Sequence, residues 1–460
     1  MRIHLHDYRR VRTNGILDGA VLMHCEMADL IARSSDTVSF HDVTNGPSCI
    51  DTVGEGETVY AGLGPYAYLY HLWRERANRS FPIVREVHTS FWSGYWTQEE
   101  LCAPYVRQGD LVLFPTEYTR QLYIKHFASI TEDNSAVAYP ILHRLPPRQA
   151  RHRPKPLSTQ SLRIGYIGAL SEAKNFDQVL AVFLDYYRQS GGRAVLSFAG
   201  KPNHPRWEQA AVCDSLVAGG VARAALRPRG VLSTDEIGSF YEDCDVVLFP
   251  STASRETLGR VILEAIAHGT PILAADLGPA PELVDEESLI HTTLHYADAY
   301  RMDAIVPLGR IDVNAAVALL MERDFHVPEL PDESLYSADR FIGLLRHTTN
   351  TSSKVEGWDR KLIDHFVLTE RPAVRIEDWL NHAEQLFLWM FGDSGQRRKK
   401  VAAEIETAEH IGAEEREKLK RIVEASCVSL ADYRGLPRII DALVMKPLSY
   451  AMAEAPVASH

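Results

Sequence analysis

The stretch that most constrains the fold lies at residues 245–276, DVVLFPSTASRETLGRVILEAIAHGTPILAAD. A short apolar run, Val246–Pro250, ends in a loop rich in serine and threonine, and a helical pattern follows. That pattern stops at Gly269, and Pro271 comes two residues later, which is a typical helix-stop signal. A second apolar run, Ile272–Ala275, follows at once. The order strand, loop, helix, strand predicts one unit of an open α/β sheet.

Two carboxylates accompany this unit. Glu256 lies in the loop before the predicted helix, and Glu264 lies about two turns inside it. Because helical side chains lean toward the N-terminus, both carboxylates are expected to point toward the start of the helix. Ligands of open α/β sheets bind beyond the carboxyl ends of the strands, where a helix N-terminus can face an anion. We therefore expect one ligand, held over the turn formed by Thr257, Leu258, Gly259 and Arg260.

This arrangement resembles the donor site of GT-B glycosyltransferases, specifically the large retaining family 4, whose Glu-x7-Glu signature is matched here by Glu256 and Glu264. The similarity extends over Phe249–Leu283 and includes His268–Pro271, HGTP. The resemblance implies an α/β fold of two Rossmann-like domains that face a cleft. The first domain would bind the acceptor and the second a nucleotide-diphosphate sugar. The resemblance also implies that Glu264 hydrogen-bonds the ribose hydroxyls and that Glu256 binds hydroxyls of the transferred sugar.

The phosphates of such a donor need positive charge. A loop, Gly168–Phe176, follows a predicted strand and is similar to the first loop of the family's donor domain. There the family places an arginine and, five residues later, a lysine on the phosphates. Lys174 occupies the lysine position, but Ala169 occupies the arginine position. A bidentate arginine is not readily replaced, and we hypothesise that Arg260 supplies the missing charge. The resemblance also brings the backbone at Val231 to the nucleotide base.

The N-terminal half supplies the remaining candidates. Gly15 lies in a Thr-Asn-Gly turn similar to the family's glycine loop, where the backbone approaches donor and acceptor closely. His88 follows a predicted strand and matches a histidine that the family places near the reacting sugar. Trp92, Tyr95 and Trp96 come next and form a candidate stacking platform for the acceptor. Aromatic clusters more often pack than bind, so packing is the alternative for these three residues.

The bulk properties exclude several classes. The chain has 460 residues, enough for two or three domains, and its net charge of −12 argues against binding to nucleic acid or to anionic membranes. Its six cysteines show no paired spacing, so neither a disulfide framework nor a zinc site is expected. No stretch approaches the ~20 apolar residues of a membrane span, and the N-terminus lacks the apolar core of a signal peptide. We therefore expect a cytoplasmic protein without integral membrane contact.

The chain divides into segments of different composition. Residues 1–143 are expected to form the acceptor domain, residues 144–160 a linker rich in proline and arginine, and residues 161–328 the donor domain. Residues 329–460 are mainly helical, and whether they fold back or join copies into a homo-oligomer stays open. The segment Thr116–Arg120, TEYTR, is expected to cap a helix. Strands are expected at Ile3–Leu5, Val84–Val87, Leu111–Phe114, Val137–Tyr139, Leu162–Ile167, Val195–Ala199, Val246–Phe249 and Ile272–Ala275.

Asp243-Cys-Asp245 looks like the metal-binding motif of other glycosyltransferases, but it leads directly into a predicted buried strand. The family that the chain resembles also needs no metal, so we expect no metal and no other cofactor. The resemblance implies transfer to a small-molecule or glycan acceptor with retention of configuration. Since no carboxylate can be assigned as a covalent nucleophile, we expect this transfer to occur at the front face. Two rival hypotheses stay open. One is a sugar-nucleotide epimerase or phosphorylase on the same fold. The other is a degenerate transferase that binds a partner, which Ala169 and the helical extension would suit.

Overall fold

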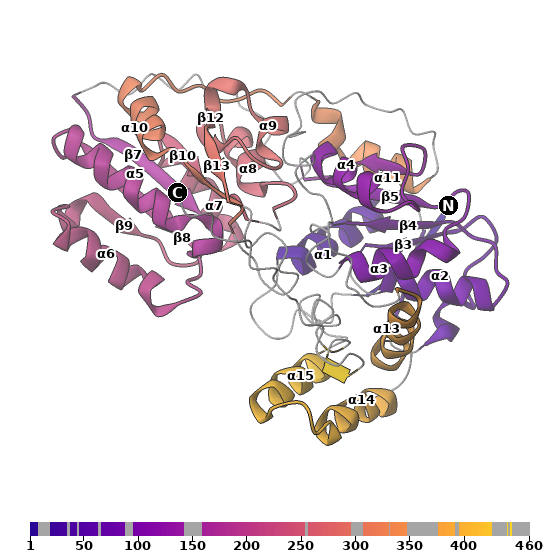
Figure 1. Ribbon diagram of the computed structural model, residues 1–460. Helices are drawn as coiled ribbons and strands as arrows, with labels where there is room; N and C mark the ends of the chain where they lie inside the picture. The colour runs from indigo at the N-terminus through magenta and orange to yellow at the C-terminus, as the bar shows by residue number, and fades with distance from the viewer. Residues whose placement is uncertain are drawn as a thin grey trace, which may run out of the picture.

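The computed structural model contains two six-stranded parallel sheets with helices packed on them (Figure 1). The structure describes residues 1–7, 19–34, 37–43, 46–62, 66–87, 95–141, 159–253, 256–295, 307–330, 332–346, 376–391, 395–425, 439 and 442–443. We call the first sheet with its helices the first lobe, and the second sheet with its helices the second lobe. The expected fold class, two Rossmann-like α/β domains with a helical extension, is confirmed.

The first lobe comes from the N-terminal part of the chain. Its strands have the order β2-β1-β3-β4-β5-β6 and are all parallel. The order 2-1-3-4-5 is that of flavodoxin-like folds, which bind ligands at the carboxyl ends of the strands. The elements are β1 (Arg2–His6), α1 (Gly19–Arg33), β2 (Thr37–His41), β3 (Thr58–Ala61), α2 (Tyr66–Arg76), β4 (Ile83–Glu86), α3 (Tyr95–Cys102), β5 (Leu111–Phe114), α4 (Glu117–His126) and β6 (Ser135–Val137).

The second lobe has the strand order β12-β11-β10-β7-β8-β9, again parallel. Counted from β7, this is the Rossmann order 6-5-4-1-2-3, whose topological switch point lies between β7 and β10. Its elements are β7 (Leu162–Ile167), α5 (Phe176–Gln189), β8 (Ala194–Ala199), α6 (Gln209–Ala218), β9 (Leu226–Pro228), α7 (Thr234–Glu242), β10 (Val246–Phe249), α8 (Arg260–Ala267), β11 (Ile272–Ala275), α9 (Ala280–Leu283), β12 (Leu289–Ile290) and α10 (Val313–Glu322).

The central strands of the second sheet are apolar along their whole length. All four residues of β10, VVLF, and of β11, ILAA, are buried. Parallel strands covered by helices on both faces need such continuous apolar runs, because neither face meets water. A small antiparallel pair, β13 (Thr292–Leu294) and β14 (Gly309–Ile311), lies beside this sheet. Short 3-10 helices are η3 (Pro47–Ile50), η5 (Ala103–Tyr105), η7 (Glu172–Lys174), η8 (Pro205–Trp207), η9 (Arg223–Ala225), η10 (Glu286–Ser288) and η11 (Glu333–Tyr336).

After the second lobe the chain returns to the first. Helix α11 (Ala338–Leu345) packs on the first lobe (Figure 1), where the Phe341 ring contacts the Tyr60 ring at 5.6 Å between centroids. Arg340 Nε donates to the Val137 carbonyl at 2.8 Å, which ties α11 to the end of β6.

The extension continues as α13 (Ile376–Phe391), α14 (Gly395–Thr407) and α15 (Ala413–Ala425). Helix α13 packs on α2 and α3, with the Phe387 ring edge-on to Tyr68 at 5.0 Å. The described part of the extension therefore folds back onto its own chain. Association of copies through it stays a prediction.

Most expected strands are present. The strands predicted at 111–114, 162–167, 246–249 and 272–275 have the observed bounds, and β6 lies two residues before the predicted Val137–Tyr139. Strands β2, β3, β9, β12, β13 and β14 were not expected. Among the described residues, no helix has both the length and the apolar character to cross a membrane. The expected cytoplasmic location stays a prediction.

Candidate active site

The strand–loop–helix–strand unit predicted from residues 245–276 is present as β10, α8 and β11. Gly259 precedes α8 in the left-handed region (φ 68°), which turns the loop sharply into the helix and favours glycine. The helix stops as predicted, with Gly269 left-handed (φ 63°) and the Thr270 N–H donating to the Ala265 carbonyl at 2.8 Å. Glu264 is therefore carried on a helix with fixed ends, and Glu256 lies just before the turn that starts this helix.

The Glu256 carboxylate is held by three donors. Lys174 Nζ lies 2.5 Å from Oε2, the Ser251 hydroxyl donates to the same oxygen at 3.0 Å, and the Gly259 N–H donates to Oε1 at 3.2 Å. Burial by itself would raise the pKa of Glu256, but the charge and hydrogen bond of Lys174, with the other two bonds, lower it overall. The carboxylate is therefore ionised near neutral pH and bridges the loops that follow β7 and β10.

The Glu264 carboxylate lies deeper, with its side chain 7% exposed. The Tyr241 hydroxyl donates to Oε2 at 3.0 Å, and Arg260 Nε donates to Oε1 at 2.6 Å. The Arg260 guanidinium also reaches α1 of the first lobe, where Nη1 lies 3.7 Å from Glu26 Oε2 and 3.5 Å from Met23 Sδ. Arg260 thus joins the second glutamate of the motif to the first lobe.

Position 169, where the family has a phosphate-binding arginine, carries no charge because it is occupied by alanine. Ala169 is exposed, and its carbonyl accepts from the Tyr166 hydroxyl at 2.8 Å. The structure directs the Arg260 guanidinium toward Glu264 and Glu26. The hypothesis that Arg260 replaces the missing phosphate-binding charge stays a prediction, and a role in neutralising Glu264 now stands beside it.

A residue that sequence reasoning missed connects the two loops. Asn175 is fully buried and left-handed (φ 52°), directly after Lys174. Its Nδ2 donates to the Pro250 carbonyl at 3.0 Å, to Thr252 Oγ1 at 2.8 Å and to the Gly309 carbonyl at 3.0 Å. These bonds hold the Lys174 loop against the loop after β10. The only local signal was an asparagine just before a helix, which also fits an ordinary cap.

The loops after β7 and β8 also approach each other closely. A Cβ atom on Gly200 would lie 1.7 Å from the Gly168 carbonyl oxygen, and Gly200 has φ 143°. The Gly200 N–H donates to the Gly230 carbonyl at 2.8 Å, which adds the loop after β9. Three loops at the carboxyl ends of neighbouring strands are thereby packed through their backbones.

A small hollow, or pocket, lies beside Glu256, with a volume of about 10 Å³, which is roughly the room that one water molecule needs. It is lined by Tyr118, Ser251, Thr252, Ala253, Glu256, Leu277, Gly278, Pro279 and Leu308. Tyr118 comes from α4 of the first lobe, so the pocket lies between the lobes.

The structure brings together Lys174, Glu256 and Gly259, and it places Arg260 on Glu264. The side chains of Thr257 and Leu258 are buried and that of Val231 is exposed. Gly15, His88 and Trp92 lie outside the described residues. Tyr95 and Trp96 are the first two residues of α3, for which the structure describes the backbone. The acceptor platform therefore stays a prediction. The expected helix cap is present, because the Thr116 side chain accepts from the Thr119 N–H at the start of α4.

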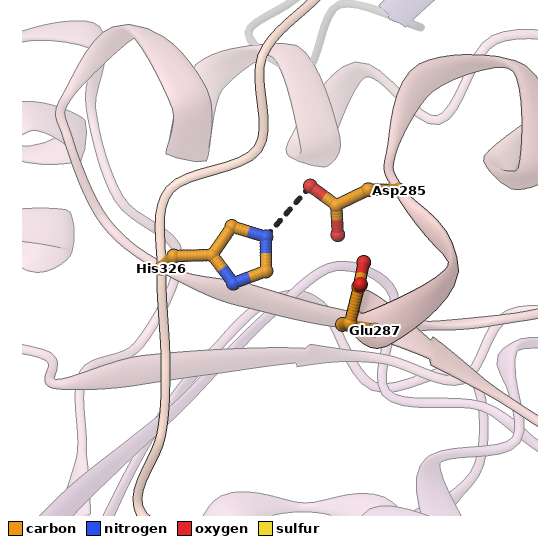
Figure 2. A group of neighbouring side chains, drawn as sticks. All are labelled: Asp285, Glu287 and His326. Carbon is orange, nitrogen blue, oxygen red and sulfur yellow. Dashed lines mark hydrogen bonds and ion pairs between the residues drawn. The ribbon is translucent and has the colours of Figure 1, made fainter.

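Among the described residues, one group of three side chains is close enough to hold a metal ion, namely Asp285, Glu287 and His326. Figure 2 shows them facing one another, with His326 Nε2 at 2.7 Å from Asp285 Oδ2. Asp285 and Glu287 precede β12, at the amino end of the sheet, whereas Lys174 and Glu256 follow the carboxyl ends of their strands. The group is therefore separate from the candidate active site, and the expectation of a metal-independent reaction stays a prediction.

Comparisons with known proteins locate the same part of the chain. Residues 148–306 match the family described as glycosyl transferases group 1. The sulfoquinovosyl transferase SQD2 of Arabidopsis thaliana is 41% identical over 58 residues, which is 13% of this chain and 11% of that protein. A D-inositol 3-phosphate glycosyltransferase of Saccharomonospora viridis is 32% identical over 155 residues, 31% of this chain and 35% of that protein. The chain thus matches about a third or less of the length of these curated relatives.

Among solved structures, the crystal structure of HepE from Anabaena in complex with UDP is 16% identical, with a TM-score of 0.49. The superposition covers 75% of this chain and 95% of that one.

Proposed function

We propose that this protein, whose residues 148–306 form a group 1 glycosyl transferase domain, is a retaining glycosyltransferase. It moves a sugar from a nucleotide-diphosphate donor to a small-molecule or glycan acceptor. The observation that carries the proposal is the joining of Lys174 to Glu256 across the switch point of the second sheet, with Glu264 on the helix that follows. Switch points are where open α/β sheets bind nucleotides.

Glu264 is suited to a ribose diol. An ionised carboxylate accepts about four hydrogen bonds, and Tyr241 and Arg260 each provide one. Two acceptor positions are left, one for each hydroxyl of the diol. The nucleotide would therefore bind without displacing the protein's own contacts to Glu264.

Lys174 and the N-terminal end of α8 are suited to the diphosphate. The Lys174 side chain is 29% exposed, so a ligand can reach it from solvent. Helix α8 begins at Arg260, directly after Gly259, and the N-terminal end of a helix carries positive potential that favours an anion. In the transfer step the bond from the anomeric carbon to the phosphate oxygen breaks. The acceptor oxygen bonds to the same face of the sugar, and its proton passes to the leaving phosphate. Charge that develops on that phosphate is stabilised by donors already in place.

The role of His88, near the reacting sugar, rests on the family resemblance. So do the contact of Glu256 with sugar hydroxyls and that of the Val231 backbone with the base. No metal is assigned to the reaction.

The proposal is tested by thermal-shift assays with uridine, guanosine and adenosine diphosphates, followed by turnover of the matching nucleotide sugars. A nucleotide present at ~100 times its Kd should stabilise the protein by ~2.7 kcal/mol. Lys174→Met should abolish most of this stabilisation, while the exposed Lys201→Met serves as the matched control. The absence of stabilisation by all three nucleotides would reject the proposal.

The two rival hypotheses give different products. An epimerase would change the sugar of the donor without releasing the nucleotide diphosphate, and a phosphorylase would require inorganic phosphate. A degenerate transferase would bind a nucleotide but show no turnover with any acceptor. Slow donor hydrolysis by the purified protein would separate an active transferase from a degenerate one.

A further inference from the structure

The first turn of α4, in the first lobe, contacts the loop that carries Glu256. The Thr116 hydroxyl donates to the Thr257 carbonyl at 2.6 Å, and the Thr119 hydroxyl donates to the same carbonyl at 3.1 Å. All of these side chains are buried. Because Thr257 directly follows Glu256, the first lobe holds the backbone of the loop that places this carboxylate.

A carboxylate from the second lobe completes the contact. Glu282, on α9, accepts the Glu117 N–H at 2.9 Å on Oε1 and the Tyr118 N–H at 3.0 Å on Oε2. These N–H groups belong to the first turn of α4, where backbone donors have no partner within the helix. Glu282 is 2% exposed, and burial raises its pKa to about 8, against the opposing effect of the two backbone bonds. Because burying a carboxylate is costly, this contact depends on both bonds being made.

The same turn forms one wall of the pocket beside Glu256. Tyr118 lines the pocket from the first lobe, opposite residues of the second lobe such as Ser251 and Gly278. A Cβ atom on Gly278 would lie 3.8 Å from the Tyr118 ring, so the two walls are in close contact. If α4 separated from Glu282, the pocket would lose the wall formed by Tyr118. The Thr257 carbonyl would lose its bonds to Thr116 and Thr119 at the same time.

We propose that Thr116, Thr119 and Glu282 form an interdomain clasp on the first turn of α4, which positions the Glu256 loop and closes the pocket with Tyr118. Thr119 and Glu282 are then positioning residues, because they act on the site through Thr257 and Tyr118. The identity of the ligand in the pocket rests on the proposed function. The clasp itself can be tested without any turnover.

The first experiment measures the clasp directly. Glu282→Gln keeps the shape of the side chain but turns an amide NH2 toward one of the two backbone N–H groups. Thr119→Val keeps the volume but removes one hydroxyl, and the exposed Glu286→Gln is the matched control. In Glu282→Gln, the amide protons of Glu117 and Tyr118 should exchange with deuterium at least ~10-fold faster, the scale set by leaving one buried backbone N–H without its acceptor. Small-angle scattering should show a larger radius of gyration for both clasp variants than for wild type and control. Exchange and scattering like those of wild type would overturn the clasp.

The second experiment separates positioning from a merely structural contact. The clasp variants should raise the KM for the donor by at least ~10-fold and change kcat less, because an incomplete pocket weakens donor binding first. Thr119→Ser keeps the hydroxyl and should restore wild-type values, which also controls for damage to the fold. Faster exchange with an unchanged donor KM would overturn the positioning role. If the wild type turns over no donor, the proposed function fails, and the exchange and scattering results still decide whether the clasp exists.

Discussion

Replacing Glu264 by glutamine tests the nucleotide site most directly. The carboxylate has about four acceptor positions, and the Tyr241 hydroxyl at 3.0 Å and Arg260 Nε at 2.6 Å occupy two of them. An amide oxygen has only two acceptor positions. In a Glu264→Gln variant the Tyr241 hydroxyl can accept from the amide NH2 while Arg260 Nε keeps the amide oxygen, which leaves one acceptor position for a ribose diol instead of two.

The expected loss of affinity follows from this count. A hydrogen bond to a charged group contributes ~1.5–3 kcal/mol, and each ~1.4 kcal/mol corresponds to a tenfold change in Kd. Loss of one such bond predicts a Kd for the preferred nucleoside diphosphate that is ~10- to 150-fold higher. Isothermal titration calorimetry measures this directly. Glu286→Gln, an exposed glutamate of η10, is the control for the loss of one negative charge.

One result would refute the reasoning about Glu264. If Glu264→Gln unfolds at the wild-type temperature and binds the nucleotide within twofold of the wild-type Kd, Glu264 does not contact the ribose. A variant with a lower unfolding temperature needs a further comparison, because Arg260 and Tyr241 both lose part of their contact with the carboxylate. The nucleotide affinities of the variant and the wild type, measured at a temperature where both are fully folded, then decide whether Glu264 contacts the ribose.

Three further predictions address the charge, the metal and the packing of the site. Arg260→Ala should lower kcat by ~10²–10³ if Arg260 supplies the phosphate-binding charge. Adding Ala169→Arg to this variant should recover part of the lost kcat. Wild-type kinetics in the Arg260→Ala variant would show that Arg260 does not replace the arginine missing at position 169. Treatment with EDTA should leave turnover unchanged. A complete loss of turnover that manganese or magnesium restores would refute metal independence. Asp285→Asn would then show whether the group of three side chains in Figure 2 binds the metal. Gly200→Ala should destabilise the protein by ~1–3 kcal/mol in urea unfolding, because its methyl group would lie 1.7 Å from the Gly168 carbonyl oxygen; an unchanged midpoint would show that the loops relax freely.

The parts of the fold that the sequence predicts are those with complete local signals. Strand β10, helix α8 and strand β11 each have an apolar run or pattern bounded by turn residues, and Gly269 and Pro271 mark the helix end. Strand β9, Leu226–Pro228, lacks such a signal. It lies at the edge of the sheet, its last two residues are exposed, and its proline cannot donate to a neighbour. Edge strands are specified by the sheet they join more than by their own residues.

The candidate site likewise contains residues that a local sequence signal predicts and residues that no local signal predicts. Glu256, Glu264 and Lys174 could be predicted as site residues because their spacing within short stretches of sequence singles them out. Some of their partners are near in sequence, such as Gly259 and Arg260, but others come from distant parts of the chain and leave no local pattern. Tyr241 precedes Glu264 by 23 residues, and Glu282 contacts a helix turn 164 to 165 residues before it. The predicted role of Thr116 as a helix cap is confirmed, but its second bond, to the other lobe, depends on how the two sheets are packed.

The return of the chain to the first lobe bears on how this protein can be engineered. Residues 332–345 follow the second lobe in sequence, yet Phe341 packs on Tyr60 and Arg340 binds the end of β6. The first lobe is therefore assembled from two separate segments of the gene product. A fragment that ends before residue 332 would expose the apolar surface that α11 covers, and it should aggregate. A chimera that exchanges first lobes between relatives must carry both segments, so the chain has to be cut at two positions.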